Sequence, residues 1–193
     1  MTGAEMNKAF VKEDDSRIDS TPEINPDARA DIPPGAMNYM TPAGALQLRK
    51  ELDNLLHEER PRLLERVNRD DSTGSGPSAD DVYESKKALR KIDRRIEFLI
   101  QRLELTEIVD PLEVQSDRIR FGASVRIQHQ DESLKDYQIV GIDETDLDKG
   151  RISWTSPLAK AVFDSAAGDV ITFKTPSHEE ELEIVSVRYE EIS

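Results

Sequence analysis

Residues 82–103 read VYESKKALRKIDRRIEFLIQRL, and this stretch decides the first half of the fold. Its branched apolar residues recur in steps of 7, 3, 4, 3 and 4. They are Val82, Leu89, Ile92, Ile96, Leu99 and Leu103. This spacing is the a/d pattern of a heptad repeat, which places one narrow apolar stripe along a helix. The stretch therefore predicts a long helix that packs against a partner helix.

The partner helix is expected upstream, from Thr41-Pro42, a pair that suits an N-cap and a first helical position. Leucines then recur at helical spacing as far as Val67, and Pro61 predicts a kink or local break because proline lacks a backbone N–H. The polar segment 72–78 is short, so two helices of roughly 30 residues must run antiparallel. The sequence predicts a long antiparallel two-helix coiled-coil hairpin.

The last 84 residues have the near-alternating pattern of strands rather than a helical period. The predicted strands are Ser124–Gln128, Tyr137–Ile142, Arg151–Thr155, Asp169–Thr175 and Glu181–Arg188. A short helix is predicted over Pro157–Asp164, with Ser156 as its cap. The fold class is therefore α+β. We expect residues 1–36, rich in proline and acids, to be a disordered tail, 37–109 to form the hairpin and 110–193 the sheet domain.

Composition excludes several classes of function. The 193 residues include no cysteine, which excludes disulfides, thiol chemistry and cysteine-type zinc sites. No apolar run is long enough for a membrane span or a signal peptide, so we expect a cytoplasmic protein without a membrane partner. The net charge of −14 argues against non-specific duplex binding. No phosphate-binding loop or nucleophile motif is present, and nothing resembles a self-sufficient active site, so we expect no enzyme.

Acidic residues flank the loop between the two predicted helices. They are Asp70, Asp71, Asp80 and Asp81. Carboxylates bind Mg²⁺ together with water and phosphate, so this hairpin tip is a candidate to complete a metal site in another macromolecule. The simpler alternative is that Asp80 and Asp81 stabilise the start of a helix in a solvated loop.

A basic run follows on the second helix, and positions 87, 90, 91 and 94 of it share one face. The run comprises Lys86, Lys87, Arg90, Lys91, Arg94 and Arg95. Such a face can follow a nucleic-acid backbone or an acidic groove. The alternative is a solvated flank that pairs across the hairpin with Glu58, Glu59 and Glu65. The histidines His57, His129 and His178 show no ligand spacing and are interpreted as surface residues.

The order of these parts and several local strings resemble the GreA/GreB family of bacterial transcription elongation factors, on the GreB side. The resemblance covers about residues 37–191 and leaves the tail outside. The strings are Tyr39-Met40-Thr41-Pro42-Ala43-Gly44, Glu58-Glu59-Arg60-Pro61, Lys86-Lys87-Ala88-Leu89-Arg90-Lys91-Ile92-Asp93-Arg94-Arg95, Ile108-Val109-Asp110, Phe121-Gly122-Ala123, Ile139-Val140-Gly141, Ser156-Pro157-Leu158-Ala159-Lys160-Ala161 and Gly168-Asp169.

This resemblance implies a helical hairpin that enters the secondary channel of RNA polymerase, and an FKBP-like domain that docks at the channel's rim. It implies docking through Ser156, Pro157 and Lys160, and contact of the basic face with nascent RNA or the channel walls. Tip acids in the family share a Mg²⁺ ion with the polymerase active site, which hydrolyses backtracked RNA. We therefore expect no stably bound cofactor, a bacterial RNA polymerase partner and a monomer.

The tip departs from the family pattern Gly-Asp-x-Ser-Glu-Asn-Ala-(Asp or Glu)-Tyr. Gly74 matches, but Ser75 stands in place of the Asp and Ser78 in place of the Glu. Asp81 keeps the third acidic position, and Val82 replaces the Tyr. A neutral hydroxyl is a weak Mg²⁺ ligand, so the expected activity is either weakened cleavage or a non-cleaving modulation of the polymerase.

Two other classes of function stay open. An FKBP-type prolyl isomerase or chaperone needs an aromatic-walled pocket, whereas the aromatic residues of the last domain are scattered in sequence. They are Phe121, Tyr137, Trp154, Phe163, Phe173 and Tyr189. The other class is a coiled-coil adaptor for a different partner.

Overall fold

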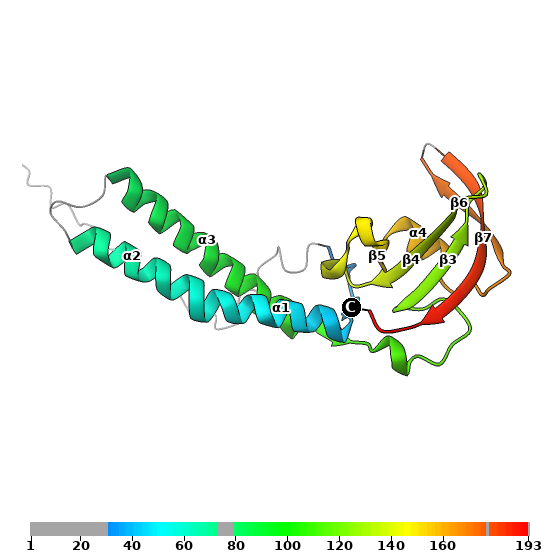
Figure 1. Ribbon diagram of the computed structural model, residues 1–193, viewed down its shortest axis with the longest axis horizontal. Helices are drawn as coiled ribbons and strands as arrows, with labels where there is room; N and C mark the ends of the chain where they lie inside the picture. The colour runs from blue at the N-terminus through cyan, green and yellow to red at the C-terminus, as the bar shows by residue number, and fades with distance from the viewer. Residues whose placement is uncertain (1–30, 73–78, 177, 193) are drawn as a thin grey trace, which may run out of the picture.

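The computed structural model of the chain describes residues 31–72, 79–176 and 178–192. Within them, a pair of long helices lies at one end of the molecule and a curled five-stranded sheet at the other (Figure 1). The α+β class is thus confirmed. Most of the predicted tail (1–30) and the serines Ser75 and Ser78 lie outside the described residues. None of the described helices is long and apolar enough to cross a membrane.

The first helix begins where the sequence predicts and is interrupted before Pro61. It consists of α1 (Pro42–Asn54), a π-helical segment (Leu55–Glu59) and α2 (Arg60–Ser72). The Thr41 hydroxyl caps it by accepting a hydrogen bond from the Gly44 N–H at 3.1 Å. Proline cannot donate to a carbonyl one turn back, and the wider π turn accommodates this loss. The irregularity expected at Pro61 is thus a π turn just before the proline, through which the helix continues.

The second helix, α3 (Ala79–Glu104), runs back beside the first (Figure 1). Ile96 and Leu99 of its apolar stripe are buried, and the other four stripe residues are half-buried. Two ion pairs join the helices outside the stripe. Arg60 Nε lies 2.7 Å from Asp93 Oδ1, and Arg95 donates twice to Glu51, at 2.6 and 2.9 Å. The bidentate hydrogen bond to Glu51 raises the pKa of Arg95.

A two-stranded parallel sheet ties the two ends of the helix pair together. β1 (Asn38–Met40) precedes α1, and β2 (Thr106–Ile108) follows α3. Three-residue strands are too short to show an alternating pattern, so the sequence did not predict them. The chain therefore enters and leaves the helix pair at one place.

The five-stranded sheet has the order β5-β4-β3-β7-β6, in which only β4 and β5 are parallel neighbours. All five predicted strands are present, with ends shifted by up to three residues. Their bounds are β3 Ala123–Gln128, β4 Leu134–Val140, β5 Arg151–Ser153, β6 Val170–Thr175 and β7 His178–Tyr189. Single 3-10 turns lie at Pro111–Glu113 (η3), Ile142–Glu144 (η4) and Leu147–Lys149 (η5).

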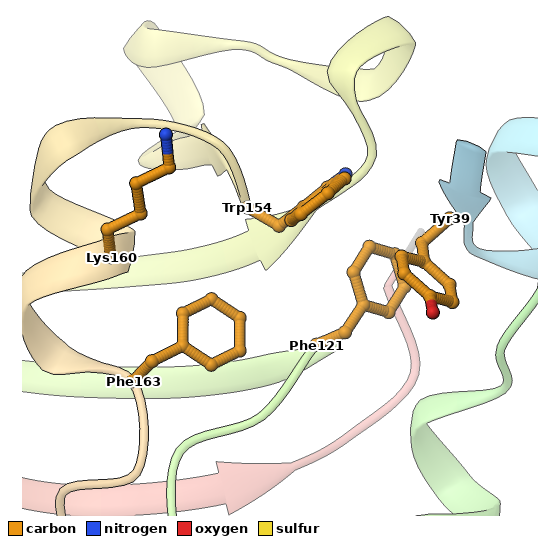
Figure 2. A pocket seen from close by; sticks show the side chains of 5 residues that line it. All are labelled: Tyr39, Phe121, Trp154, Lys160 and Phe163. Atoms are coloured by element: carbon orange, nitrogen blue, oxygen red, sulfur yellow. The ribbon is translucent and has the colours of Figure 1, made fainter. Parts of the chain in front are cut away.

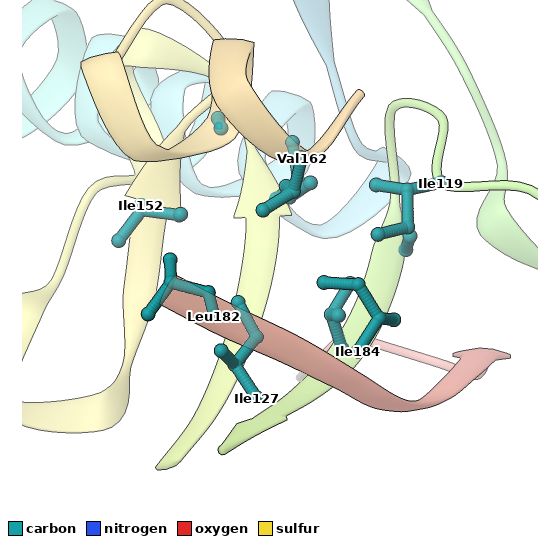
Figure 3. Packing of buried hydrophobic residues seen from close by; sticks show 10 residues of the cluster. Ile119, Ile127, Ile152, Val162, Leu182 and Ile184 are labelled. Atoms are coloured by element: carbon teal, nitrogen blue, oxygen red, sulfur yellow. The ribbon is translucent and has the colours of Figure 1, made fainter. Parts of the chain in front are cut away.

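The short helix α4 (Pro157–Val162) covers one face of this sheet and is two residues shorter than predicted. Ala159 and Val162 are buried in the core, where Val162 faces branched residues of the strands (Figure 3). Those buried partners include Ile127, Ile139, Ile152, Leu182 and Ile184. Burial of each such side chain contributes about 1.5–3 kcal/mol, so α4 is held firmly on the sheet.

A buried ion pair joins the helix pair to the sheet. Arg102, on the last turn of α3, is 1% exposed, and its Nε lies 2.7 Å from Asp143 Oδ2 in η4. The same carboxylate oxygen lies 3.4 Å from Asn38 Nδ2 of β1, which is buried too. The junction is therefore polar, with its charges paired inside it.

The neighbouring residue Glu144 makes a second link at this junction. Its Oε2 accepts hydrogen bonds from the N–H groups of Thr41, at 2.9 Å, and Gly141, at 3.0 Å. Its Oε1 accepts from the Thr41 hydroxyl. A Cβ on Gly44 would overlap the Glu144 carboxylate, so a larger residue there would displace the Glu144 side chain from its present position. Glu144 thus binds the start of the helix pair directly to the sheet.

Removal of the Arg102 guanidinium should destabilise the protein strongly. We expect Arg102→Met to lower the free energy of unfolding by about 3–5 kcal/mol, because the Asp143 carboxylate, only 14% exposed, would lose its charged partner. Urea titration measures this loss. The matched control is Arg126→Met, because the pair that Arg126 forms with Asp136 is exposed and should contribute less than about 1 kcal/mol. Equal losses in the two variants would contradict a structural role for the junction.

Candidate functional site

An aromatic pocket of about 340 Å³ lies where α4, the sheet and β1 meet (Figure 2). It is lined by Tyr39, Phe121, Trp154, Lys160 and Phe163. The Tyr39 and Trp154 rings meet edge to face, with centroids 5.5 Å apart, and the Tyr39 and Phe121 centroids are 5.9 Å apart. The four rings are half-buried, so apolar surface remains open to a ligand. A pocket of this size accepts one or two large side chains.

The pocket corrects the expectation that the aromatic residues of the last domain are scattered. Phe121, Trp154 and Phe163 come from separate segments but surround a common space, and Tyr39 joins them from outside that domain (Figure 2). Tyr137 lies elsewhere, beside His129, and Tyr189 donates to the Arg118 carbonyl. No sequence pattern could reveal the pocket, since its residues share neither spacing nor neighbourhood along the chain.

The predicted docking residues lie together beside this pocket. The Ser156 hydroxyl caps α4 by accepting from the Ala159 N–H at 3.2 Å. Pro157 is exposed at the first helical position, and the exposed Lys160 lines the pocket itself. Within residues 31–72, 79–176 and 178–192, the Lys160 ammonium forms no ion pair. This end of α4 therefore presents a fixed proline and a free cation next to apolar rings.

The predicted basic face is exposed along α3. Lys86, Lys87, Arg90, Lys91 and Arg94 all lie at the surface. The predicted alternative, pairing across the hairpin with Glu58, Glu59 and Glu65, does not occur among the described ion pairs. Instead Glu58 pairs with Arg62 on its own helix, 3.9 Å away, and Lys87 lies 3.3 Å from Glu84.

The two cross-helix ion pairs described above use other residues of α3 than Arg90, Lys91 and Arg94. They are made by Asp93 and Arg95. In the part of the chain that the structure describes, Arg90, Lys91 and Arg94 form no ion pair. Three cations on one side of a long helix are thus available to an external anion.

The candidate metal ligands lie at the far end of the helix pair (Figure 1). Asp70 and Asp71 belong to the last turn of α2, and Asp80 and Asp81 to the first turn of α3. The side chains of the latter two are exposed. The described residues contain no cluster of three or more acidic or histidine side chains able to hold a metal alone. The carboxylates of Asp80 and Asp81 are thus exposed at the tip, and the described residues contain no complete metal site.

One histidine is not the surface residue that the sequence indicated. The side chain of His129 is 13% exposed and bridges Glu180, at 3.3 Å from Nδ1, and Tyr137, at 3.2 Å from Nε2. Burial, and to a lesser extent the Glu180 charge, raises the pKa of Tyr137. His57 is exposed as expected. The His129 cluster lies in the sheet and, since it contacts neither the pocket nor the helix pair, is interpreted as structural.

Comparison with known proteins identifies the family. Residues 38–108 match the model "Transcription elongation factor, N-terminal", and residues 114–189 match "Transcription elongation factor, GreA/GreB, C-term". Transcription elongation factor GreB of Neisseria meningitidis serogroup B is 42% identical over 153 residues, which are 79% of this chain and 94% of that protein. GreB of Yersinia pestis is 38% identical over 152 residues, 79% of this chain and 89% of that protein.

Among solved structures, the GreA factor homolog 1 protein of Thermus thermophilus matches with a TM-score of 0.38 and 21% identity, over 79% of this chain and 99% of that one. Two family models together account for both the helix pair and the sheet, and the GreB relatives are matched over nearly their whole length. The chain therefore belongs to the GreA/GreB family of transcription elongation factors.

Proposed function

We propose that this factor binds bacterial RNA polymerase by inserting its helix pair into the secondary channel, where it modulates elongation. The observation that carries the proposal is a family member whose long helix pair projects away from the sheet. Within the described residues, Arg90, Lys91 and Arg94 on one side of α3 form no ion pair and are exposed. In this proposal the polymerase is the catalyst, and the factor contributes side chains to its active site. We place the factor in the cytoplasm as a monomer.

We further propose that residues 37–109 act as a coiled-coil finger and that residues 110–193 form an FKBP-like docking domain. The heptad stripe between α3 and the first helix supports the coiled-coil assignment. A curled five-stranded sheet with one short helix packed on it supports the FKBP-like assignment. The buried junction at Arg102 and Glu144 supports the division, because it lies between the two parts.

The docking surface in this proposal is the end of α4 together with the aromatic pocket. Ser156 fixes where the helix begins, Pro157 offers a rigid apolar contact, and Lys160 offers a charge. Apolar rings beside an exposed cation suit a partner segment that carries an apolar side chain next to an acidic one.

The pocket also favours a second candidate function. Its four rings would accept a prolyl side chain, which is the requirement of an FKBP-type isomerase or chaperone. A proline-isomerisation assay on the unmodified chain separates this candidate from polymerase docking. A coiled-coil adaptor is separated by a pull-down, which would then recover no polymerase subunits.

The exposed cations of α3 are proposed to face nascent RNA or the acidic channel walls. The positions that carry this role are Lys86, Lys87, Arg90, Lys91 and Arg94. Contacts of this kind release counterions, so affinity should fall as salt rises.

The tip is proposed to share a Mg²⁺ ion with the polymerase rather than to bind one alone. Two exposed carboxylates, on Asp80 and Asp81, fit this limited role because Mg²⁺ takes one or two carboxylates and completes its shell with water and phosphate. Asp70 and Asp71 are further candidates on the opposite helix end. When bound there, the ion would activate the water that hydrolyses backtracked RNA. Ser75 and Ser78 replace the two family carboxylates, which weakens the proposed binding of Mg²⁺ at the tip.

Docking is tested by Pro157→Glu, which places a charge in the proposed contact. We expect polymerase affinity to fall about tenfold, equivalent to about 1.4 kcal/mol, in a fluorescence titration. The domain should stay folded, because glutamate is well tolerated in the first turn of a helix. The matched control is Pro176→Glu, an exposed proline in the turn after β6. Unchanged affinity for Pro157→Glu would remove α4 from the interface.

The basic face is tested by Arg90→Glu combined with Arg94→Glu. Loss of two phosphate or acidic contacts should lower polymerase affinity and reduce the slope of log affinity against log salt by roughly 2. Lys135→Glu with Lys149→Glu changes the charge equally on exposed residues of the sheet domain and should leave the slope unchanged. A slope unaffected by the arginine changes would show that the face is only solvated.

The tip is tested by restoring the family ligands with Ser75→Asp and Ser78→Glu. We expect the unmodified factor to stimulate transcript cleavage weakly, and the double variant to raise the rate at least about tenfold, since each 1.36 kcal/mol of transition-state stabilisation is tenfold. Cleavage is measured on a stalled elongation complex at physiological Mg²⁺. Equal polymerase affinity of the two proteins is the control that assigns the difference to the chemical step.

The same assay distinguishes which carboxylates serve. If the four aspartates already supply the ligands, the unmodified factor cleaves well, and Asp80→Ala with Asp81→Ala abolishes cleavage. Strong cleavage that survives the loss of Asp70, Asp71, Asp80 and Asp81 together would refute both versions, because no carboxylate would remain at the tip.

A further inference from the structure

The aromatic pocket has a candidate occupant within this chain. Both family models begin beyond the first 37 residues, so this N-terminal segment is additional to the part shared with the family. It contains one aromatic residue, Phe10, in the sequence Ala9-Phe10-Val11-Lys12-Glu13-Asp14-Asp15. An aromatic and an aliphatic residue stand there before three acids, with Lys12 between the two groups, so the net charge of residues 9–15 is −2. Apolar side chains followed by net negative charge complement an apolar pocket beside the exposed Lys160 ammonium group.

We propose that residues 9–15 bind the pocket of their own chain and compete with the polymerase for it; the competition rests on the docking proposed above. Phe10 and Val11 would fill the space among Phe121, Trp154 and Phe163, and the acids would meet Lys160. Glu13 is three residues from Phe10, hence at most about 10 Å away along an extended chain. A lysine that lines the same pocket is within reach of that carboxylate.

Chain length permits this contact. Tyr39 lines the pocket, and Asp31 precedes it by eight residues, so the start of the described chain lies at most about 29 Å from the pocket wall. The residues between Asp15 and Asp31 can span about 50 Å when extended. A tether of this length holds the segment at an effective concentration in the millimolar range, which is enough to support a weak contact.

Intramolecular binding would lower polymerase affinity by the fraction of time that the pocket is free. A pocket that is open for about 10–30% of the time reduces the apparent affinity about 3- to 10-fold. The segment would thus be an autoinhibitory element that a strong polymerase contact displaces.

Trp154 is the only tryptophan in the chain, so its fluorescence reports directly on the pocket. The test compares the full chain with the double variant Phe10→Ser and Val11→Ser. We expect the variant to shift Trp154 emission to longer wavelength and to increase its quenching by acrylamide about twofold. The matched control, Ile18→Ser with Ile24→Ser, removes two apolar residues from the same segment and should change neither signal. A synthetic peptide of residues 5–18 added to the variant should reverse the shift, and a scrambled peptide should not.

Three outcomes would overturn the inference. Identical Trp154 signals in the parent and the Phe10 variant would show that the segment does not bind the pocket, whatever the polymerase affinity. A signal that depends on protein concentration over about a hundredfold range would assign the pocket to a second copy of the chain. A Trp154 shift with no gain in polymerase affinity would show that binding occurs without competition.

The proposed polymerase docking is judged separately, by Pro157→Glu. Failure of that variant to weaken binding, combined with a Trp154 shift in the Phe10 variant, would remove the docking surface and keep the intramolecular contact. The supporting result is the Trp154 shift together with a 3- to 10-fold gain in polymerase affinity for the Phe10 variant alone.

Discussion

Two consecutive carboxylates, on Asp143 and Glu144, join the helix pair to the five-stranded sheet. Asp143 pairs with Arg102 and Asn38 from the two ends of the helix pair, and Glu144 binds the N–H and hydroxyl groups of Thr41. Displacement of this contact would leave donors and charges in the junction without partners, which is unfavourable.

The pocket depends on this junction. Tyr39 belongs to β1, which the junction and the β1–β2 pairing fix beside the sheet, and its ring completes a wall begun by Phe121 and Trp154. The pocket is thus lined both by β1, at the base of the helix pair, and by residues of the sheet end of the molecule. The shape of the pocket consequently depends on how these two parts of the molecule are placed, so Trp154 is a probe of both parts.

The periodic parts of this fold could be predicted from the sequence, and the contacts between them could not. The apolar stripe from Val82 to Leu103 and the alternation in the strands arise from residues close together in the sequence. Both patterns can therefore be recognised from the sequence alone. Arg102 looks like any cation of a charged helix, and only its meeting with Asp143, 41 residues away, shows that it is buried. The pocket rings were unpredictable for the same reason.

The helix pair extends far beyond the place where its ends are tied. Its first helix, Pro42 to Ser72, is about 46 Å long at 1.5 Å per residue. A tilt of this helix by one degree about β1 and β2 moves its far end by about 0.8 Å. Functional constellations must be held within about 0.5 Å, which corresponds to less than about one degree. The angular stiffness of a small polar joint therefore sets how accurately the far end of the helix pair is positioned.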